Sequence, residues 1–196
     1  MRAALGLKAR TGRAIVVAVA GTVEDPALVE RSEMKLLREG AFAPYHAAED
    51  LPPAAADAAV KRDVADAHRL AERGIRDALK RVAAVGHDVR GCGVLVGPGL
   101  PPWSTQEILA VHVRMHQAEG VMFREVLVAG ARACGLGPAT LREKSALEDA
   151  AKKLGWTRAT LDARIAALGR SAGPPWGKDQ KEAAAAALMA LAETRK

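Results

Sequence analysis

Three short apolar segments precede the first helical pattern, and this order limits the fold more than any other feature of the chain. They are Ala3–Lys8, Ala14–Ala20 and Ala27–Leu37, and glycine-containing turns separate them. Segments of this length joined by such turns predict strands paired as an antiparallel meander. The sequence therefore predicts three paired strands ahead of the first helix that could cover the sheet.

Helical and strand patterns alternate in the middle of the chain. A long helix is predicted over Ala54–Val85, followed by a fourth strand over Val89–Val96. A further helix is expected from Ser104 to Cys134, opened by a capping box formed by Ser104 and Glu107. Thr140–Lys144 is a candidate fifth strand. The long helix shows one apolar stripe at three- and four-residue spacing, made of Val60, Val64, Ala67, Ala71, Ile75, Ala78 and Val82.

Three helices are expected to end the chain, over Ser145–Leu154, Thr157–Leu168 and Lys178–Thr194. Ser145 and Glu148 have the spacing of a second capping box. Strands joined through helices run parallel with right-handed crossovers, so the complete order predicts an α/β fold with a mixed sheet and helices on both faces. We expect residues 1–196 to form a single domain.

The formal net charge is +6, with 29 basic and 23 acidic residues. The excess is concentrated in residues 1–13 and 142–196. A basic balance favours phosphate-bearing partners such as nucleic acid, although an ordinary solvated surface is the alternative. Aromatic residues make up only 3% of the chain, which argues against a surface that stacks bases.

No apolar run approaches the length of a membrane span, so no membrane association is expected. The basic start followed by Ala14–Ala20 resembles a leader, but two β-prone runs joined by a turn fit a hairpin better. Cys92 and Cys134 lie among apolar residues without metal-ligand spacing. We interpret them as buried, reduced thiols of a cytoplasmic protein.

Four segments resemble the RuvC-type Holliday-junction resolvases of the ribonuclease H-like superfamily. The first is Leu5-Gly-Leu-Lys-Ala-Arg-Thr-Gly-Arg-Ala14, which is similar to the opening strand and T-G turn of that family. The others lie in the helix over residues 119–138, in the helix over residues 145–155 and in the terminal helix over residues 178–188. The resemblance implies a ribonuclease H-like fold, a nucleic-acid partner and a homodimer.

The chain departs from this family in its acidic residues. Family members place one acid on the first strand, one on the fourth and two on the last helix, where they hold the metal ions. Here Lys8 stands at the first-strand position, and the end of the fourth strand has no acid. Asp179 and Glu182 remain on one face of the terminal helix. The resemblance therefore implies a protein that lacks nuclease activity, with no catalytic residues and no cofactor.

Lys8 has two readings. In the first, its ammonium group takes the place of the metal and lies within about 4 Å of a carboxylate of Asp179 or Glu182. In the second, Lys8 ends an edge strand and its side chain lies in water. Arg10, Thr11, His46 and Lys178 are further candidates for binding a phosphate-bearing ligand. The start of the terminal helix supplies free backbone N–H groups that favour anions there.

One other sequence pattern is typical of a metal-binding site. His112, His116 and Glu119 have the spacing H-x-x-x-H-x-x-E within a helix, and histidines four residues apart can chelate a metal from one helical face. A hydrogen-bonded histidine pair beside the core is the alternative. Two enzymatic hypotheses stay open: action on a phosphorylated small molecule in the same cleft, or single-metal catalysis.

Overall fold

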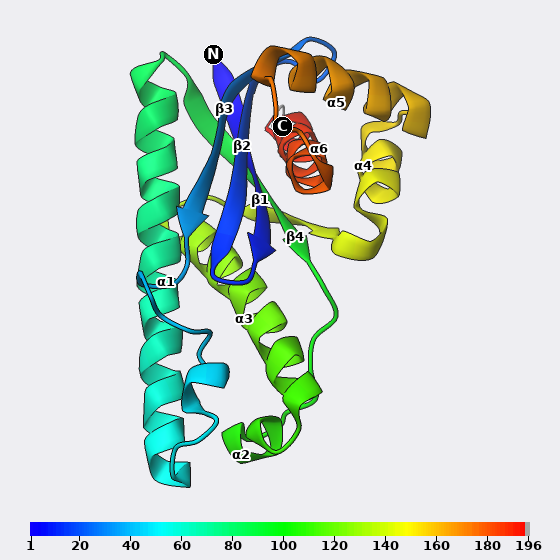
Figure 1. Ribbon diagram of the computed structural model, residues 1–196. Coiled ribbons are helices and arrows are strands. Elements are labelled where there is room, and N and C mark those ends of the chain that lie inside the picture. Colours follow the sequence, from blue (N-terminus) through cyan, green and yellow to red (C-terminus); the bar gives the residue numbers. More distant parts are fainter. Residues whose placement is uncertain (195–196) are drawn as a thin grey trace.

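The computed structural model describes residues 1–194 and shows a mixed sheet with helices on both faces (Figure 1). Residues 195 and 196 of the predicted single domain lie outside this range. The strands are β1 (Arg2–Arg10), β2 (Arg13–Gly21), β3 (Pro26–Lys35), β4 (Asp88–Val96) and β5 (Pro138–Arg142). The helices are α1 (Pro53–Ala84), α2 (Thr105–Leu109), α3 (His112–Ala133), α4 (Ala146–Leu154), α5 (Arg158–Ala172) and α6 (Lys178–Glu193), with 3-10 turns η1 (His46–Ala48) and η2 (Glu143–Ser145).

The sheet order within the described residues is β3-β2-β1-β4-β5. β1 pairs antiparallel with β2 and parallel with β4, and β2 pairs antiparallel with β3, which confirms the predicted meander. β1 thus lies at the centre of the sheet. β5 pairs parallel with β4. This is the mixed sheet expected of a ribonuclease H-like α/β fold, and it brings the carboxyl ends of β1, β4 and β5 to one edge.

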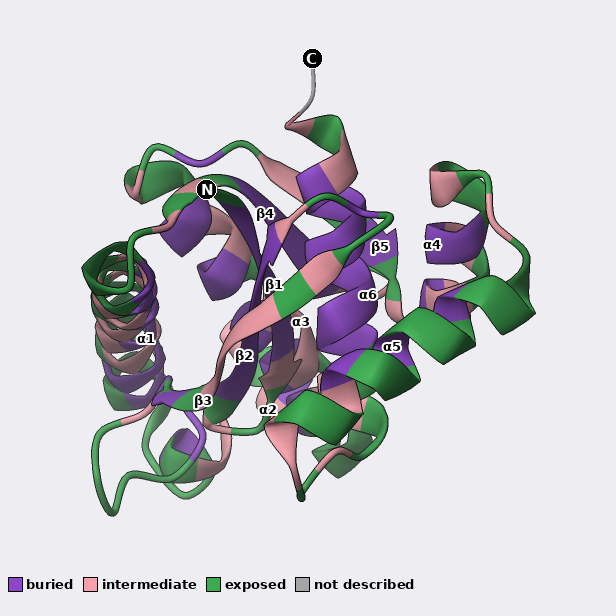
Figure 2. Cartoon of the chain, turned by 90° about the horizontal axis from the view of Figure 1, so that it is seen from above, coloured by how far each residue is buried: buried purple, intermediate pink, exposed green. Residues whose placement is uncertain are grey.

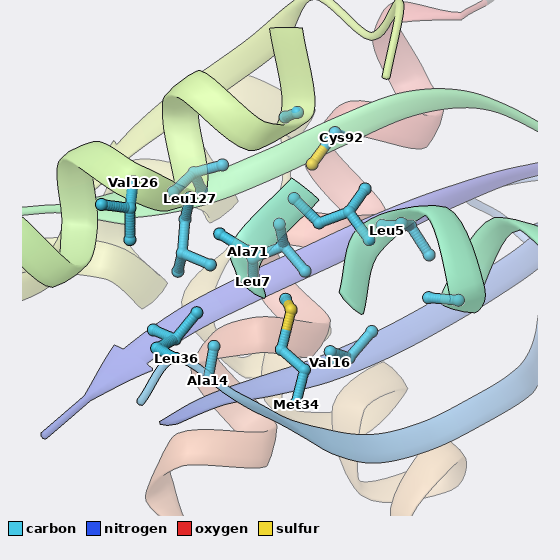
Figure 3. Packing of buried hydrophobic residues seen from close by; sticks show 14 of the residues in the cluster. Leu5, Leu7, Ala14, Val16, Met34, Leu36, Ala71, Cys92, Val126 and Leu127 are labelled. Atoms are coloured by element: carbon cyan, nitrogen blue, oxygen red, sulfur yellow. The ribbon is translucent and has the colours of Figure 1, made fainter. Parts of the chain in front are cut away.

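One face of the sheet is covered by α1 and α3. The predicted stripe of α1 faces this core, where Ala71 and Ile75 are fully buried. Figure 3 shows how Ala71 packs among side chains from the strands and from α3, including Leu7, Met34 and Leu127. Alternate residues of each strand point into this core because side chains of a strand alternate between faces.

The other face is covered by α6, with α5 packing against β3 on one side of it and α4 against β5 on the other (Figure 2). All residues from Glu182 to Leu191 are buried, which is why α6 lacks an amphipathic stripe. Gly6 on β1 and Gly93 on β4 allow this close approach. A Cβ atom at Gly6 would lie 1.8 Å from the carbonyl oxygen of Ala183, and one at Gly93 would lie 2.2 Å from that of Ala186.

The expected helix from Ser104 to Cys134 is wrong in one respect, because the chain breaks it into α2 and α3. The Ser104–Glu107 capping box is present and opens α2. Val111 is then extended, at φ −140° and ψ 110°, before α3 begins at His112. The break lets Ile108 of α2 pack beside Met115 and Ala118 of α3 in a small apolar cluster.

The predicted second capping box is also wrong. Ser145 makes no cap; its hydroxyl instead donates to Asp149 at 2.8 Å, because η2 already turns the chain before α4. Glu148 pairs with Arg158.

Of the two thiols, Cys92 is buried, which raises its pKa to about 12, whereas Cys134 is only partly buried. Within residues 1–194, no helix combines the length and apolar character needed to cross a membrane.

Candidate functional site

Lys8 ends among carboxylates rather than in water. One face of β1 packs on α6 and carries the alternate residues Ala4, Gly6 and Lys8. Lys8 therefore lies beside the first turns of α6, one helical turn before the residues of that helix that approach Gly6. Its Nζ lies 3.2 Å from Oδ1 of Asp179 and also contacts Oε2 of Glu182. The Lys8 side chain is 2% exposed, which fits the prediction of a buried, paired ammonium group.

A third carboxylate joins this group. Glu143 Oε1 lies 3.3 Å from Lys8 Nζ, and the residue directly follows β5. The sequence interpretation missed Glu143 because it looked for acids at the family positions only. An acid at the carboxyl end of a parallel strand, at the edge where the strand ends meet, was the available signal.

Two arginines complete the arrangement. Arg10 donates to both oxygens of Asp179, at 2.7 Å from Nε and 2.8 Å from Nη2. Arg124 of α3 donates to Glu143 Oε2 from Nε at 3.1 Å and from Nη2 at 2.6 Å. Three cations thus face three carboxylates. We call these six residues the Lys8 cluster: Lys8, Arg10, Arg124, Glu143, Asp179 and Glu182.

Three groups of this cluster, Lys8, Asp179 and Glu143, are held ionised by their neighbours. Burial alone would lower the pKa of Lys8, but its contacts with Glu182, Asp179 and Glu143 raise it above its ordinary value. Burial would raise the pKa of Asp179, and the neighbouring Arg10 and Lys8 lower it instead. Glu143 behaves in the same way, with its pKa lowered by Arg124 and Lys8 against the effect of burial. Lys8 is thus held protonated by its three carboxylate neighbours.

These shifts predict how stability depends on pH. Lowered carboxyl pKa values stabilise the fold above the ordinary range of Asp and Glu, and this contribution is lost as pH falls through the folded-state values. The raised Lys8 pKa stabilises the fold below about 10.5 and is lost at higher pH. We expect urea unfolding to show a plateau between about pH 5 and pH 10.

The variant Glu143→Gln tests the acid side of this profile. It should lose stability at neutral pH and show a shallower decline on acidification than the wild type. Glu39→Gln, which changes an exposed acid outside the cluster, is the matched control and should leave the decline unchanged. Parallel acid profiles for Glu143→Gln and wild type would contradict the assignment of Glu143 to the cluster.

A basic cleft opens beside the Lys8 cluster at the carboxyl ends of β4 and β5. It has a volume of about 600 Å³ and is bordered by four basic side chains and the acid Glu143. The basic residues are Arg124, Arg142, Lys144 and Lys178. Gly97 lines the cleft too, where a side chain would come within 2.9 Å of the Arg124 guanidinium.

Lys144 and Lys178 are the cations of this cleft that are most available to a ligand. Lys144 is exposed and has no ion-pair partner within residues 1–194. The Lys178 side chain is 79% exposed, with its Nζ 3.8 Å from Glu182. Arg142 is held by Asp149. A second hollow of about 530 Å³ shares Arg124 and Lys144 with the cleft and extends along α3 to His116.

The remaining sequence candidates divide into two places. Thr11 lies exposed in the turn between β1 and β2, outside the Lys8 cluster. His46 does not reach the cleft; it lies in η1 and contacts His112 and His116. Glu119 is buried and hydrogen-bonds to the ring of His46. This geometry favours a role in orienting His46 over the expected role of Glu119 as a direct metal ligand. The sequence interpretation did not place His46 beside the histidine pair because His46 is far away along the chain.

Comparison with protein-family models and with curated proteins found no match. Two solved structures of RuvC from Thermus thermophilus are similar to this chain. One is RuvC itself, at 13% identity and a TM-score of 0.49, covering 95% of this chain and 91% of that one. The other is RuvC in complex with a Holliday junction substrate, at 12% identity and a TM-score of 0.48, covering 96% and 92%. These likenesses concern the fold; the chemistry depends on the residues that this chain places at its site.

Proposed function

We propose that this protein binds nucleic acid through the phosphate backbone at the basic cleft, without cutting it by a two-metal mechanism. The observation that carries the proposal is the exposed pair Lys144 and Lys178 at the edge where β4 and β5 end. Ligands of open α/β sheets bind at this edge. Exposed lysines are suited to phosphates as point charges and impose no sequence preference.

The extent of the basic surface favours a polymer over a small phosphorylated ligand. The cleft and the adjoining hollow follow one another from Lys178 to α3, with Arg124 and Lys144 lining both. A polyanion presents phosphates in series and gains from each cation it meets. The scarcity of aromatic residues agrees with contacts to the backbone rather than to stacked bases.

The Lys8 cluster supports the absence of nuclease activity. Two-metal catalysis needs carboxylates free to hold divalent cations on both sides of the scissile phosphate. Here Asp179 is occupied by Arg10 and Lys8, while Glu143 is occupied by Arg124 and Lys8. A cation entering this space would have to displace the buried ammonium group of Lys8.

A salt titration tests this function. Binding to duplex, branched and single-stranded DNA should weaken with salt, and log K should fall linearly with log salt. The double variant Lys144→Gln with Lys178→Gln should reduce the magnitude of this slope by about 2, because each lysine that contacts a phosphate contributes about 1. Bound junction DNA should remain intact in Mg²⁺ or Mn²⁺.

The matched control removes two basic charges from α1, whose residues line neither the cleft nor the adjoining hollow. Lys61→Gln with Arg73→Gln changes the net charge equally and should leave the slope unchanged. Equal losses in both double variants would indicate binding by net charge alone and would reject the cleft. Competition by inorganic phosphate as strong as that by DNA would indicate a small ligand instead. Metal-dependent cleavage that Asp179→Asn abolishes would overturn the non-catalytic part of the proposal.

A further inference from the structure

We propose that His46, His112 and His116 form a binding site for a divalent transition metal ion, with Zn²⁺ as the ion that fits best. The three imidazoles each offer one nitrogen, and these ligand atoms all lie within 4.8 Å of one another. The site is separate from the Lys8 cluster, and the inference does not depend on nucleic-acid binding. We call it the histidine site.

Two of the ligands come from the first turn of α3. Because helix α3 starts at His112, His112 and His116 are one turn apart on the same face. Their Nε2 atoms are 3.0 Å apart, and the rings are nearly perpendicular. At zinc–nitrogen distances of 2.0–2.1 Å, tetrahedral ligands lie about 3.3 Å apart, so this pair already has nearly the required spacing.

The third ligand comes from a distant part of the chain. His46 begins η1, in the segment between β3 and α1, and its ring centroid lies 5.2 Å from that of His112 and 4.6 Å from that of His116. Tyr45, next to it, packs into the small apolar clusters beside α1 and α2. The loop is therefore fixed where it can present His46 to the helix.

Glu119 provides the observation that distinguishes this site from a chance group of histidines. It is 4% exposed, and its two oxygens lie 2.8 and 2.9 Å from Nδ1 of His46. Oε1 also accepts the backbone N–H groups of Tyr45 and His46, each at 3.1 Å. A buried carboxylate that accepts Nδ1–H fixes the tautomer and leaves Nε2 free to bind a metal.

The ligand set selects the class of metal. Imidazole nitrogens suit Zn²⁺, Cu²⁺ and Ni²⁺, whereas Mg²⁺ and Ca²⁺ require oxygen ligands. Three protein ligands leave a fourth position for water or another donor, as in open zinc sites. His112 and His116 are exposed, and His116 lines the hollow that adjoins the basic cleft, so the fourth position is accessible from that side.

Metal titration of tag-free protein, dialysed against a chelator, tests the proposal. We expect one equivalent of Zn²⁺ to bind in calorimetry, and Co²⁺ to give the visible absorption of a tetrahedral site. His46→Ala and His112→Ala should each weaken Zn²⁺ binding by at least about 100-fold, and Glu119→Gln by about 10- to 100-fold through the lost orientation of His46.

The two remaining histidines of the chain supply the controls. His68→Ala and His87→Ala should bind Zn²⁺ as the wild type does. Because Glu119 is buried, circular dichroism must first show that Glu119→Gln is folded; His112→Ala changes an exposed residue and keeps the test valid if it is not. Unchanged affinity in His112→Ala, equal losses in the controls, or no Zn²⁺ binding at tenfold molar excess would each overturn the proposal and leave a hydrogen-bonded histidine pair.

Discussion

Replacing Lys8 by alanine should destabilise the protein by about 3–5 kcal/mol, as expected when one partner of a buried ion pair is removed. The ammonium group is 2% exposed and is shared by Asp179, Glu182 and Glu143. Asp179 and Glu143 keep an arginine when Lys8 is lost, whereas the ion pair left to Glu182 among residues 1–194 is the long contact with the exposed Lys178, at 3.8 Å. The stranded Glu182 carboxylate is the main source of the loss. Urea unfolding at neutral pH measures it.

A double-mutant cycle identifies the partner. Lys8→Met combined with Glu182→Leu removes the lysine and the most buried carboxylate together, and should recover much of the stability lost in Lys8→Met alone. Lys8→Met combined with Asp179→Asn should recover less, because Asp179 is also bound by Arg10. Wild-type stability for Lys8→Ala would show that the ammonium group contributes nothing to the fold.

The second large effect is expected at Gly6. Alanine at this position would place Cβ 1.8 Å from the carbonyl oxygen of Ala183, a contact that only movement of the α6 backbone can relieve. We expect Gly6→Ala to cost at least about 3 kcal/mol, at the upper end of the range for overpacked cores. Thermal and urea unfolding measure this loss.

Gly99→Ala is the matched control. A Cβ atom at Gly99 meets nothing within 4 Å, so this change should alter stability by no more than about 0.5 kcal/mol. If Gly6→Ala and Gly99→Ala had the same melting temperature, α6 would not pack on the sheet as closely as described. Gly93→Ala, whose Cβ would lie 2.2 Å from the Ala186 carbonyl oxygen, should resemble Gly6→Ala.

Local patterns were sufficient to predict the strands in chain order and the antiparallel pairing of the first three, although the fifth strand, predicted over Thr140–Lys144, runs over Pro138–Arg142. The meander, the parallel fourth strand and the stripe of α1 follow from apolar periodicity and from turn residues, which act over a few residues. The break at Val111 was missed because the helical pattern continues through it, and only the packing of Ile108 on Met115 favours the turn. The Ser145 cap failed because η2 already turns the chain before α4.

The sites were predictable only in part. The pairing of Lys8 with Asp179 or Glu182 was predicted because a lysine stands where the family has an acid. The distance of 3.2 Å between Lys8 Nζ and Asp179 Oδ1 agrees with it. Glu143 and Arg124 were missed because their approach depends on how β5 and α3 meet at the sheet edge. Similarly, the contact between His46 and Glu119 spans 73 positions, and no periodic pattern connects a loop to a helix over that separation.

The alanines of α6 have a consequence for the conformational entropy of folding. Five consecutive alanines, residues 183–187, are completely buried, and alanine has no rotamers to lose on burial. Docking the alanine segment of the helix therefore orders the backbone at almost no side-chain entropy cost. Rotamer freedom is lost instead in the long side chains at the first turns of α6, in Lys8, and in the buried Leu188, Met189 and Leu191. Ordering of the alanine segment and ordering of the ion-pair cluster are thus separate contributions to the conformational entropy of folding.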